Sequence, residues 1–541
     1  GSIVTVAAFG AIAVIVLLVA CINFMNLSTA KAAQRIRETG IRKAAGASQA
    51  GLIVQFVGEA VLMAALAMLV ALACVELALP AFNAIVQREL SLQSLGAAVS
   101  VPLLAVLILV VGIGSGSYPA FYIASCKPAL ILRGQLVGGK GGAWLRSALV
   151  VVQFTVAIVL LISVATLYLQ VRFARNQETG YDKEQVVVLG NLGREGVGRQ
   201  WDAMKRDLLA QPGVLQVSAA NSIPTHDIGT SYFITYQGGT ERRSMPAMLV
   251  DVDFFETLGI GLLAGRTFSV ASGMDQHRAT QPGTGGSSGT YIVSEEAARQ
   301  FGWTPQQAIG KWVEVTCCGM GQGLIVGVVK DVQYQSIHVP KGPVLYFIPP
   351  EPEQYVSQET RLGLHNIVIK LSAHDLPATL ARIDDSWKHW RPTQPITRFF
   401  LSDEFNALYQ DEDRQQRMLV SFALLAIFIT CLGLYGLSCY NAERRSKEVG
   451  VRKVLGGSVW SIVLLLTNDF SKLVLIANVV AWPVAYYAME RWLQNFAYRI
   501  DLTPLIFLGS GFIALCIAWV TVGGTAAKAA SQKPVLALRY E

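Results

Sequence analysis

Seven long stretches without charged residues limit what this 541-residue chain can fold into. A helix needs about 20 mostly apolar residues to cross a bilayer, and most of the stretches are that long. Two are shorter and must continue as helix past charged residues whose tips can reach water. The stretches are 1–30, 60–75, 90–126, 147–171, 418–442, 473–489 and 502–527. Because 52% of residues are hydrophobic and 15% charged, we predict a polytopic α-helical membrane protein with seven transmembrane helices.

Basic residues in the short connections set the predicted orientation. Lys and Arg concentrate in the cytoplasmic loops of membrane proteins. Four segments hold 17 basic residues and only three acidic ones: 31–48, 127–146, 444–458 and 528–541. We therefore place these segments in the cytoplasm, the start of the chain outside and the C-terminus inside.

The same alternation places about 245 residues, 171–416, outside the cytoplasm. This segment holds 22 basic and 27 acidic residues, whereas the rest of the chain carries a surplus of 12 positive charges. The overall charge of +7 therefore reflects membrane topology. Nucleic-acid binding would need basic residues gathered on one exposed face, so we expect no nucleic-acid partner.

The outer segment is predicted to be an α/β domain of two subdomains. Strand, helix and strand patterns follow one another in 185–221 and again in 366–402. These two units are expected to share one subdomain, and the intervening 225–362 would form a second, strand-rich one. Helices next to the fourth and fifth spans are expected to run straight into them as a stalk.

Motifs for metal or nucleotide binding are not evident. The six histidines lack the spacing of a ligand pair. Cys317 and Cys318 are adjacent, so a disulfide between them would be strained, and a reduced pair is favoured. The stretch "GGKGG" (138–142) lacks the hydroxyl residue that follows the lysine of a phosphate loop. We expect no cofactor bound by this chain.

A short basic element occurs twice, each time after an apolar span. "RIRETGIRKAAGAS" (35–48) and "RSKEVGVRKVLGGS" (445–458) share seven of fourteen positions at an offset of 410. A second pair, "ASCKPALILRG" (124–134) and "ASQKPVLALRY" (530–540), follows the third span of each half. Each half is thus three spans with the same two cytoplasmic signatures. The repeat is parallel in the membrane.

Topology alone would explain the charges but not the fixed Glu, Gly and Ser positions. In a helix, Arg42 would follow Glu38 by four residues, the favourable order for an ion pair. Gly40 and Gly46 lower helix propensity by about 1 kcal/mol each, which suggests a short helix with a break or a close backbone approach. We interpret the element as a cytoplasmic docking helix.

At these residues the chain resembles a known family. "CINFMNLSTAKAAQRIRETGIRKAAGAS" and "CLGLYGLSCYNAERRSKEVGVRKVLGGS" are similar to the coupling-helix signature of FtsX-type permeases in the MacB class of ABC transporters. "YIVSEEAARQFGWTPQQAIGKWVEV" resembles the periplasmic domain of the same class. The resemblance implies a bacterial inner-membrane permease. It also implies a cytoplasmic ABC ATPase dimer that binds ATP and Mg²⁺ and moves stalks and outer domain by mechanotransmission.

The resemblance also implies which residues contact the ATPase. They are Arg35, Arg37, Glu38, Gly40, Arg42, Lys43 and Gly46 in the first element, and Arg445, Lys447, Glu448, Gly450, Arg452, Lys453 and Gly456 in the second. No catalytic or metal-binding residue is expected. A periplasmic adaptor and an outer-membrane channel are further candidate partners. The cargo would be a drug, a peptide or a lipoprotein, and the absence of any cargo stays an open alternative.

The predicted domains follow from the repeat. They are a first permease unit (1–135), a linker and fourth helix (136–171), the outer domain with stalk helices (172–416) and a second permease unit (417–541). Compared with the family pattern, the first half lacks a leading helix and an outer domain. Two alternatives stay open: a membrane-anchored sensor or regulator acting through the outer domain, and an ion-coupled secondary transporter, which would place ionisable residues near the midplane.

Overall fold

The structure is a computed structural model that divides the chain into two compact units. A membrane unit comprises residues 1–170, 411–493 and 500–541, and an outer unit comprises 171–410 and 494–499. The residues that the structure describes are 3–86, 89–124, 140–190, 192, 200–229, 231–276, 289–315, 321–348, 363–456 and 458–531.

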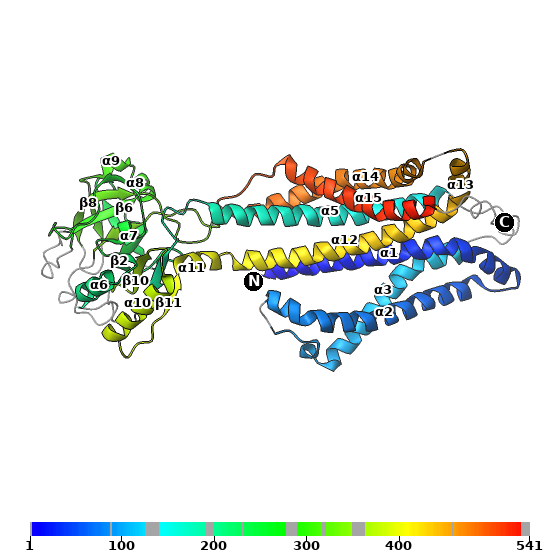
Figure 1. The fold of residues 1–541 in the computed structure, drawn as a ribbon, viewed down its shortest axis with the longest axis horizontal. Coiled ribbons are helices and arrows are strands. Elements are labelled where there is room, and N and C mark those ends of the chain that lie inside the picture. The colour runs from blue at the N-terminus through cyan, green and yellow to red at the C-terminus, as the bar shows by residue number, and fades with distance from the viewer. Residues whose placement is uncertain are drawn as a thin grey trace. The chain divides into compact units, whose positions relative to one another are not determined.

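Long helices make up the membrane unit (Figure 1). They are α1 (Ile3–Ala44), α2 (Gln49–Val86), α3 (Ala97–Ala124), α5 (Lys140–Asn176), α12 (Gln410–Arg444), α14 (Val459–Leu493) and α15 (Pro504–Ser531). Each has the length and apolar composition to cross a membrane. The seven predicted spans are confirmed, and α2 and α14 continue past the charged residues that flank their apolar stretches.

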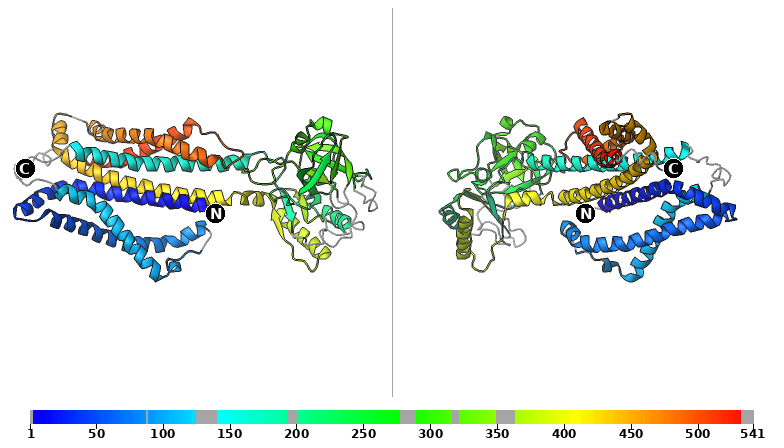
Figure 2. Two further views of the ribbon diagram at one scale, coloured as in Figure 1. Left: turned by 180° about the vertical axis from the view of Figure 1, so that it is seen from behind. Right: turned by 45° about the vertical axis from the view of Figure 1, so that its right-hand side comes forward.

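Helix pairs in the two halves of the membrane unit approach closely through glycine. Gly116 of α3 lies against Ala60 of α2, and Gly511 of α15 lies against Asn478 of α14. In the second half, side chains of α5, α12, α14 and α15 form one apolar core around Phe154, Ile158 and Leu434. Figures 1 and 2 also show α1 running beside α12.

Two boundaries of the membrane unit differ from the sequence-based expectation. The third span begins at Ala97 and not at residue 90, because a short 3₁₀ helix (η1, Leu92–Leu95) ends at Gly96, whose φ is 69°. The second repeated element forms a separate helix, α13 (Ser446–Val454), after a break at Arg445. The expectation of a short helix is wrong for the first element, which continues α1 without interruption to Ala44.

The first sheet of the outer unit joins the two predicted strand–helix–strand units. Its strand order is β11-β1-β10-β2, and every neighbouring pair is antiparallel. The strands are β1 (Val186–Leu189), β2 (Val214–Ala220), β10 (Asn366–Leu371) and β11 (Arg398–Phe400). The helices α6 (Trp201–Leu209) and α10 (Leu376–Trp390) turn apolar faces inward: Met204 and Leu208 on α6, and Ile383 and Trp387 on α10.

The second sheet closes into a barrel. Its order is β5-β8-β6-β9-β4-β3-β7, and β7 also pairs with β8, so no open edge remains along that ring. The strands are β3 (Ser231–Tyr236), β4 (Arg243–Leu249), β5 (Leu262–Gly265), β6 (Gly289–Ser294), β7 (Trp312–Val315), β8 (Gln322–Val329) and β9 (Leu345–Phe347). Short helices lie between them: α7 (Phe254–Thr257), α8 (Glu295–Gln300) and α9 (Pro305–Ala308). The predicted α/β domain of two subdomains is confirmed.

The predicted stalk is continuous at one end only. The fourth span continues as helix to Asn176. Before the fifth span, α11 (Leu401–Ala407) ends and α12 begins separately at Gln410. The expectation of a straight run is therefore wrong for this second connection, which breaks at Leu408 and Tyr409.

Residues 494–499, in the loop between α14 and α15, belong to the outer unit. The backbone N–H groups of Ala497 and Tyr498 donate to the carbonyl of Ile337, at 3.1 and 3.3 Å. Phe496 is 5% exposed, and its ring stacks on His338 with centroids 4.1 Å apart. Burial lowers the pKa of His338, which favours the neutral ring in this contact. We call residues 494–499 the docked loop.

Candidate functional site

The two repeated elements end in the same way. Gly46 and Gly456 have φ values of 100° and 87°, the left-handed conformation that often follows the last helical turn. Two residues later, the Oγ atoms of Ser48 and Ser458 accept hydrogen bonds from N–H groups three positions on, at 3.1 and 3.2 Å. These serines cap the N-termini of α2 and α14. Each repeated Gly-x-Ser therefore ends one helix and starts the next.

The predicted ion pair is present in both halves. A guanidinium nitrogen of Arg42 lies 2.7 Å from a carboxylate oxygen of Glu38, and the corresponding distance between Arg452 and Glu448 is 2.9 Å. All four side chains are about half exposed. Pairs at this exposure and spacing contribute only a few tenths of a kcal/mol. The glutamates therefore orient the arginines more than they stabilise the helix.

The repeated lysines connect the two signatures of each half. Lys43 donates from Nζ to the carbonyl oxygen of Ala124 at 2.5 Å, and Lys453 donates to that of Ala530 at 2.7 Å. Carbonyls in the last turn of a helix lack intrahelical donors and carry the negative end of the helix dipole. An ammonium group suits such acceptors. Each lysine thus joins the first signature to the helix end where the second signature begins.

An additional pair ties the second element to α14. Arg445 lies 3.1 Å from Asp469, with both side chains about half exposed. The repeat aligns these residues with Arg35 and Glu59. The side chains of Arg35, Arg37 and Lys447 lie outside the described residues, as does the environment of Gly40. Gly450 lies inside α13 and is buried.

The sequence-based reasoning missed exposed apolar residues in these elements. Ile41 is 57% exposed, and its repeat counterpart Val451 is 49% exposed. Val454 and Leu455 are 64% and 80% exposed. The signal was available, because an aliphatic residue stands at both positions of the aligned pair. We call Ile41 in the first half, and Val451, Val454 and Leu455 in the second, the apolar tips.

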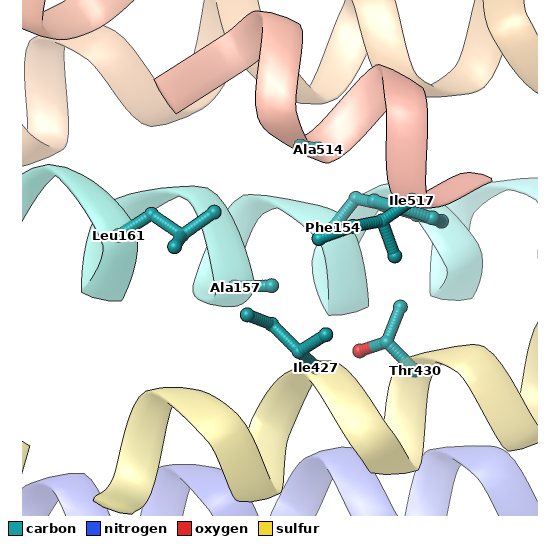
Figure 3. Close-up of a pocket in the computed structure, with 7 residues that line it drawn as sticks. All are labelled: Phe154, Ala157, Leu161, Ile427, Thr430, Ala514 and Ile517. Carbon is teal, nitrogen blue, oxygen red and sulfur yellow. The ribbon is translucent and has the colours of Figure 1, made fainter. Parts of the chain in front are cut away.

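A small pocket lies among α5, α12 and α15 (Figure 3). Its lining residues are Phe154, Ala157, Leu161, Ile427, Thr430, Ala514 and Ile517. The Thr430 hydroxyl donates to Ala426 of its own helix at 2.7 Å, so it is not directed to a ligand. An apolar lining of this kind offers no site for a charged solute.

Charged groups inside the outer unit stabilise its fold. Asp275 is 1% exposed at its side chain and accepts hydrogen bonds from Arg266, Thr290 and the backbone of Ser269. Burial acts to raise the pKa of Asp275, but these donors outweigh it and hold the pKa below its usual range. Within the described ranges, no group of three or more His, Cys, Asp and Glu side chains could hold a metal ion. Cys317 and Cys318 lie outside the described residues.

Comparison with protein families now identifies the membrane halves. Residues 10–128 and 420–534 each match the model of the FtsX-like permease C-terminal domain. Each match contains one repeated element, two complete spans and most of a third. The two halves of the polytopic membrane unit are therefore FtsX-like permease regions. Together with the charge distribution, this makes it a multi-pass inner-membrane protein with a large extracytoplasmic domain.

Solved structures similar to this chain are domains of permeases and transporters. The periplasmic region of MacB from Actinobacillus actinomycetemcomitans is 16% identical, with 42% of this chain and 93% of that chain covered and a TM-score of 0.29. A permease domain from Porphyromonas gingivalis is 14% identical, with 40% of this chain and 89% of that chain covered and a TM-score of 0.27. The extracellular domain of the noncanonic ABC-type transporter YknZ from Gram-positive bacteria is 16% identical, with 39% of this chain and 98% of that chain covered and a TM-score of 0.26. No protein of curated function matches the sequence.

Proposed function

We propose that this protein is the membrane permease subunit of an ABC transporter. A separate cytoplasmic ATPase dimer binds the two repeated elements, and ATP hydrolysis there changes the conformation of the outer unit. ATP and Mg²⁺ are held by the ATPase and not by this chain. The observation that carries the proposal is the repeated element itself. Two copies with matching caps, ion pairs and lysine contacts offer two equivalent docking sites to a dimeric partner.

The apolar tips supply the contact surface in this proposal. Protein interfaces gain most of their affinity from a buried apolar centre surrounded by polar groups. In this proposal, Ile41 and Val451 form such apolar centres. The polar groups beside them are Arg42 and Arg452, which directly follow them in sequence and are ion-paired with Glu38 and Glu448. The charges then orient the partner, and the aliphatic side chains enter its groove.

The chain connections support a mechanotransmission role in this proposal. The fourth span continues as helix into the outer unit, and the fifth begins where that unit ends. We propose that movement of the membrane halves reaches the outer unit through these connections, to export or extract a drug, a peptide or a lipoprotein. A periplasmic adaptor and an outer-membrane channel would act on the outer unit.

Replacing both Ile41 and Val451 with aspartate tests the docking assignment. On docking, each new carboxylate would lose its water in the groove of the ATPase without gaining a charged partner. We therefore expect co-purification of the ATPase to be lost. Each single variant should retain part of it. The readout is the amount of ATPase recovered with the tagged permease from membranes.

Trp144→Gln provides the control, because Trp144 is 71% exposed on α5 and lies outside both elements. It should leave the ATPase bound. Insertion of every variant into the membrane is checked by fractionation. Full ATPase recovery with the double aspartate variant would exclude docking at the apolar tips.

A further inference from the structure

The two helices that lead to the repeated elements contact each other inside the membrane unit. In both Figures 1 and 2, α1 lies beside α12. The contact includes the rings of Phe9 and Phe422, whose centroids are 6.2 Å apart. It extends to Leu27 on α1 and Gly436 on α12. Since a helix rises 1.5 Å per residue, the contact covers most of a membrane span.

At this contact, one residue meets its own repeat counterpart. Asn23 lies against Gly433, and these positions differ by 410, the offset of the repeat. A Cβ atom added to Gly433 would lie 2.3 Å from Oδ1 of Asn23. The Nδ2 group of Asn23 donates to the carbonyl of Ile429 at 3.2 Å. The asparagine side chain therefore occupies the space that the glycine leaves empty.

A second glycine of α12, Gly436, also faces α1, but it meets Leu27 and not its own repeat counterpart. Asn26 aligns with Gly436, and a Cβ atom on Gly436 would lie 2.2 Å from a methyl carbon of Leu27. Asn26 is 1% exposed, and neither amide atom has a hydrogen-bond partner among the described residues. Both asparagines thus stand on α1 and both glycines on α12.

This asymmetry matters because parallel repeats meet around a two-fold axis. On such an axis each position of one half faces the same position of the other. Two first halves would bring Asn23 against a second Asn23, where the structure has room for one side chain. Two second halves would bring glycine against glycine, with no asparagine to make the hydrogen bond to Ile429. Only unlike halves fill the space and keep the hydrogen bond to Ile429.

We infer that Asn23 with Gly433, next to Leu27 with Gly436, forms a complementary contact that pairs the first half of the chain with its second half. One chain then supplies both members of the pair. A second copy of the chain is not needed to complete it, and equal halves of two copies do not substitute for it.

Cross-linking of the full-length chain tests this pairing. In a variant without its eight native cysteines, new cysteines replace Phe9 and Phe422, and a short thiol cross-linker is added to membranes. We expect efficient cross-linking within one chain, so the product keeps the mass of a monomer on a denaturing gel. A product of dimer mass would show pairing between copies and would overturn the inference.

Exchange of the two residues tests complementarity. Gly433→Asn should reduce the cross-linked fraction about tenfold, a change that corresponds to ~1.4 kcal/mol and lies within the usual cost of overpacking. Asn23→Gly should reduce it less, since it creates a void and removes one hydrogen bond. The exchange variant Asn23→Gly with Gly433→Asn should recover most of the cross-linking. In this variant the asparagine side chain and the glycine that makes room for it have only exchanged helices.

Gly10→Asn is the matched control. It makes the same substitution on α1 at a position where an added Cβ would meet nothing within 4 Å, and it should leave the cross-linked fraction unchanged. Unaltered cross-linking in Gly433→Asn would show that the contact does not require the space that a glycine leaves at position 433. An exchange variant no better than Gly433→Asn alone would show that the contact is not complementary. Either result would overturn the inference.

Discussion

The two halves of the membrane unit share their cytoplasmic contacts but differ in how much they bury. In each of the three spans of the first half, 11% or less of the 18 residues in the most apolar stretch are buried. In the four later spans, the buried share of the corresponding stretch is 33–44%. The ion pairs, the left-handed glycines, the serine caps and the lysine-to-carbonyl contacts nevertheless appear in both. The short repeated sequence therefore specifies the repeated element with little help from the surrounding packing.

The outer ends of the halves differ in another way. The docked loop of the second half groups with the outer unit, whereas residues 89–96 of the first half group with the membrane unit. Among the described residues, the second half thus contributes a loop to the outer unit, and the first half contributes none. This difference, and the equivalence of the cytoplasmic contacts, can each be tested by substituting matched positions.

Phe496→Ala should have the largest effect, because it removes a buried ring from the docked loop. Phenylalanine-to-alanine changes in buried sites cost about 3–5 kcal/mol. A local cost of about 3 kcal/mol would raise the opening equilibrium of the loop roughly 100-fold. Hydrogen exchange of the Ala497 and Tyr498 amides, which donate to Ile337, should accelerate accordingly.

The first-half loop supplies the control. Leu92→Ala changes a residue that is 41% exposed, and it should leave exchange at Ala497 and Tyr498 unchanged. Slow exchange at these amides in Phe496→Ala would mean that Phe496 does not hold the loop. The proposed difference between the outer ends would then be lost.

Replacing the repeated lysines tests the equivalence of the cytoplasmic ends. Methionine keeps most of the side-chain length but removes the ammonium donor. Hydrogen bonds to charged groups contribute about 1.5–3 kcal/mol, so we expect Lys43→Met and Lys453→Met each to lower the free energy of unfolding by about 2 kcal/mol. Denaturant unfolding in detergent measures both.

Arginine at the same positions should restore part of the loss, because it can still donate to a helix-end carbonyl. Similar losses in the two halves would support an element specified by its own sequence. If Lys453→Met is destabilising and Lys43→Met is neutral, the contact depends on the denser packing of the second half.

Much of this architecture could be predicted because its determinants are local. Apolar length predicted the spans, charge predicted orientation, and the i, i+4 spacing predicted the pair of Glu38 with Arg42. The strand–helix–strand patterns predicted the first sheet of the outer unit. In each case, residues close in sequence carry the signal.

The features that were missed depend on partners distant in sequence. Closure of the barrel requires β7 to pair with both β3 and β8, and no local pattern specifies two partners. The acceptors of Lys43 and Lys453 are backbone carbonyls, which have no residue-type signature. The contact of Asn23 with Gly433 was visible only as "NFMN" aligned with "GLYG", and its meaning required the two helices to be adjacent.

The smallest expected effect concerns Gly46 and Gly456. Both residues are left-handed, and a Cβ atom at either position would meet nothing within 4 Å. The cost of Gly46→Ala or Gly456→Ala is therefore conformational, without a steric clash. Placing a non-glycine residue in this region costs about 1–2 kcal/mol, partly offset by the reduced freedom of the unfolded chain. We expect each variant to lose about 1 kcal/mol of unfolding free energy.

Substitution by asparagine at these two positions distinguishes the cost of backbone strain from the cost of replacing glycine by any other residue. Asn adopts the left-handed conformation more readily than alanine, so Gly46→Asn and Gly456→Asn should cost less than the alanine variants. Because neither site contacts other atoms at this point, the two halves should respond alike. Equal costs for Asn and Ala would argue against backbone conformation as the cause. A larger cost at Gly456 than at Gly46 would show that the separate helix α13 needs this ending more than the continuous helix α1 does.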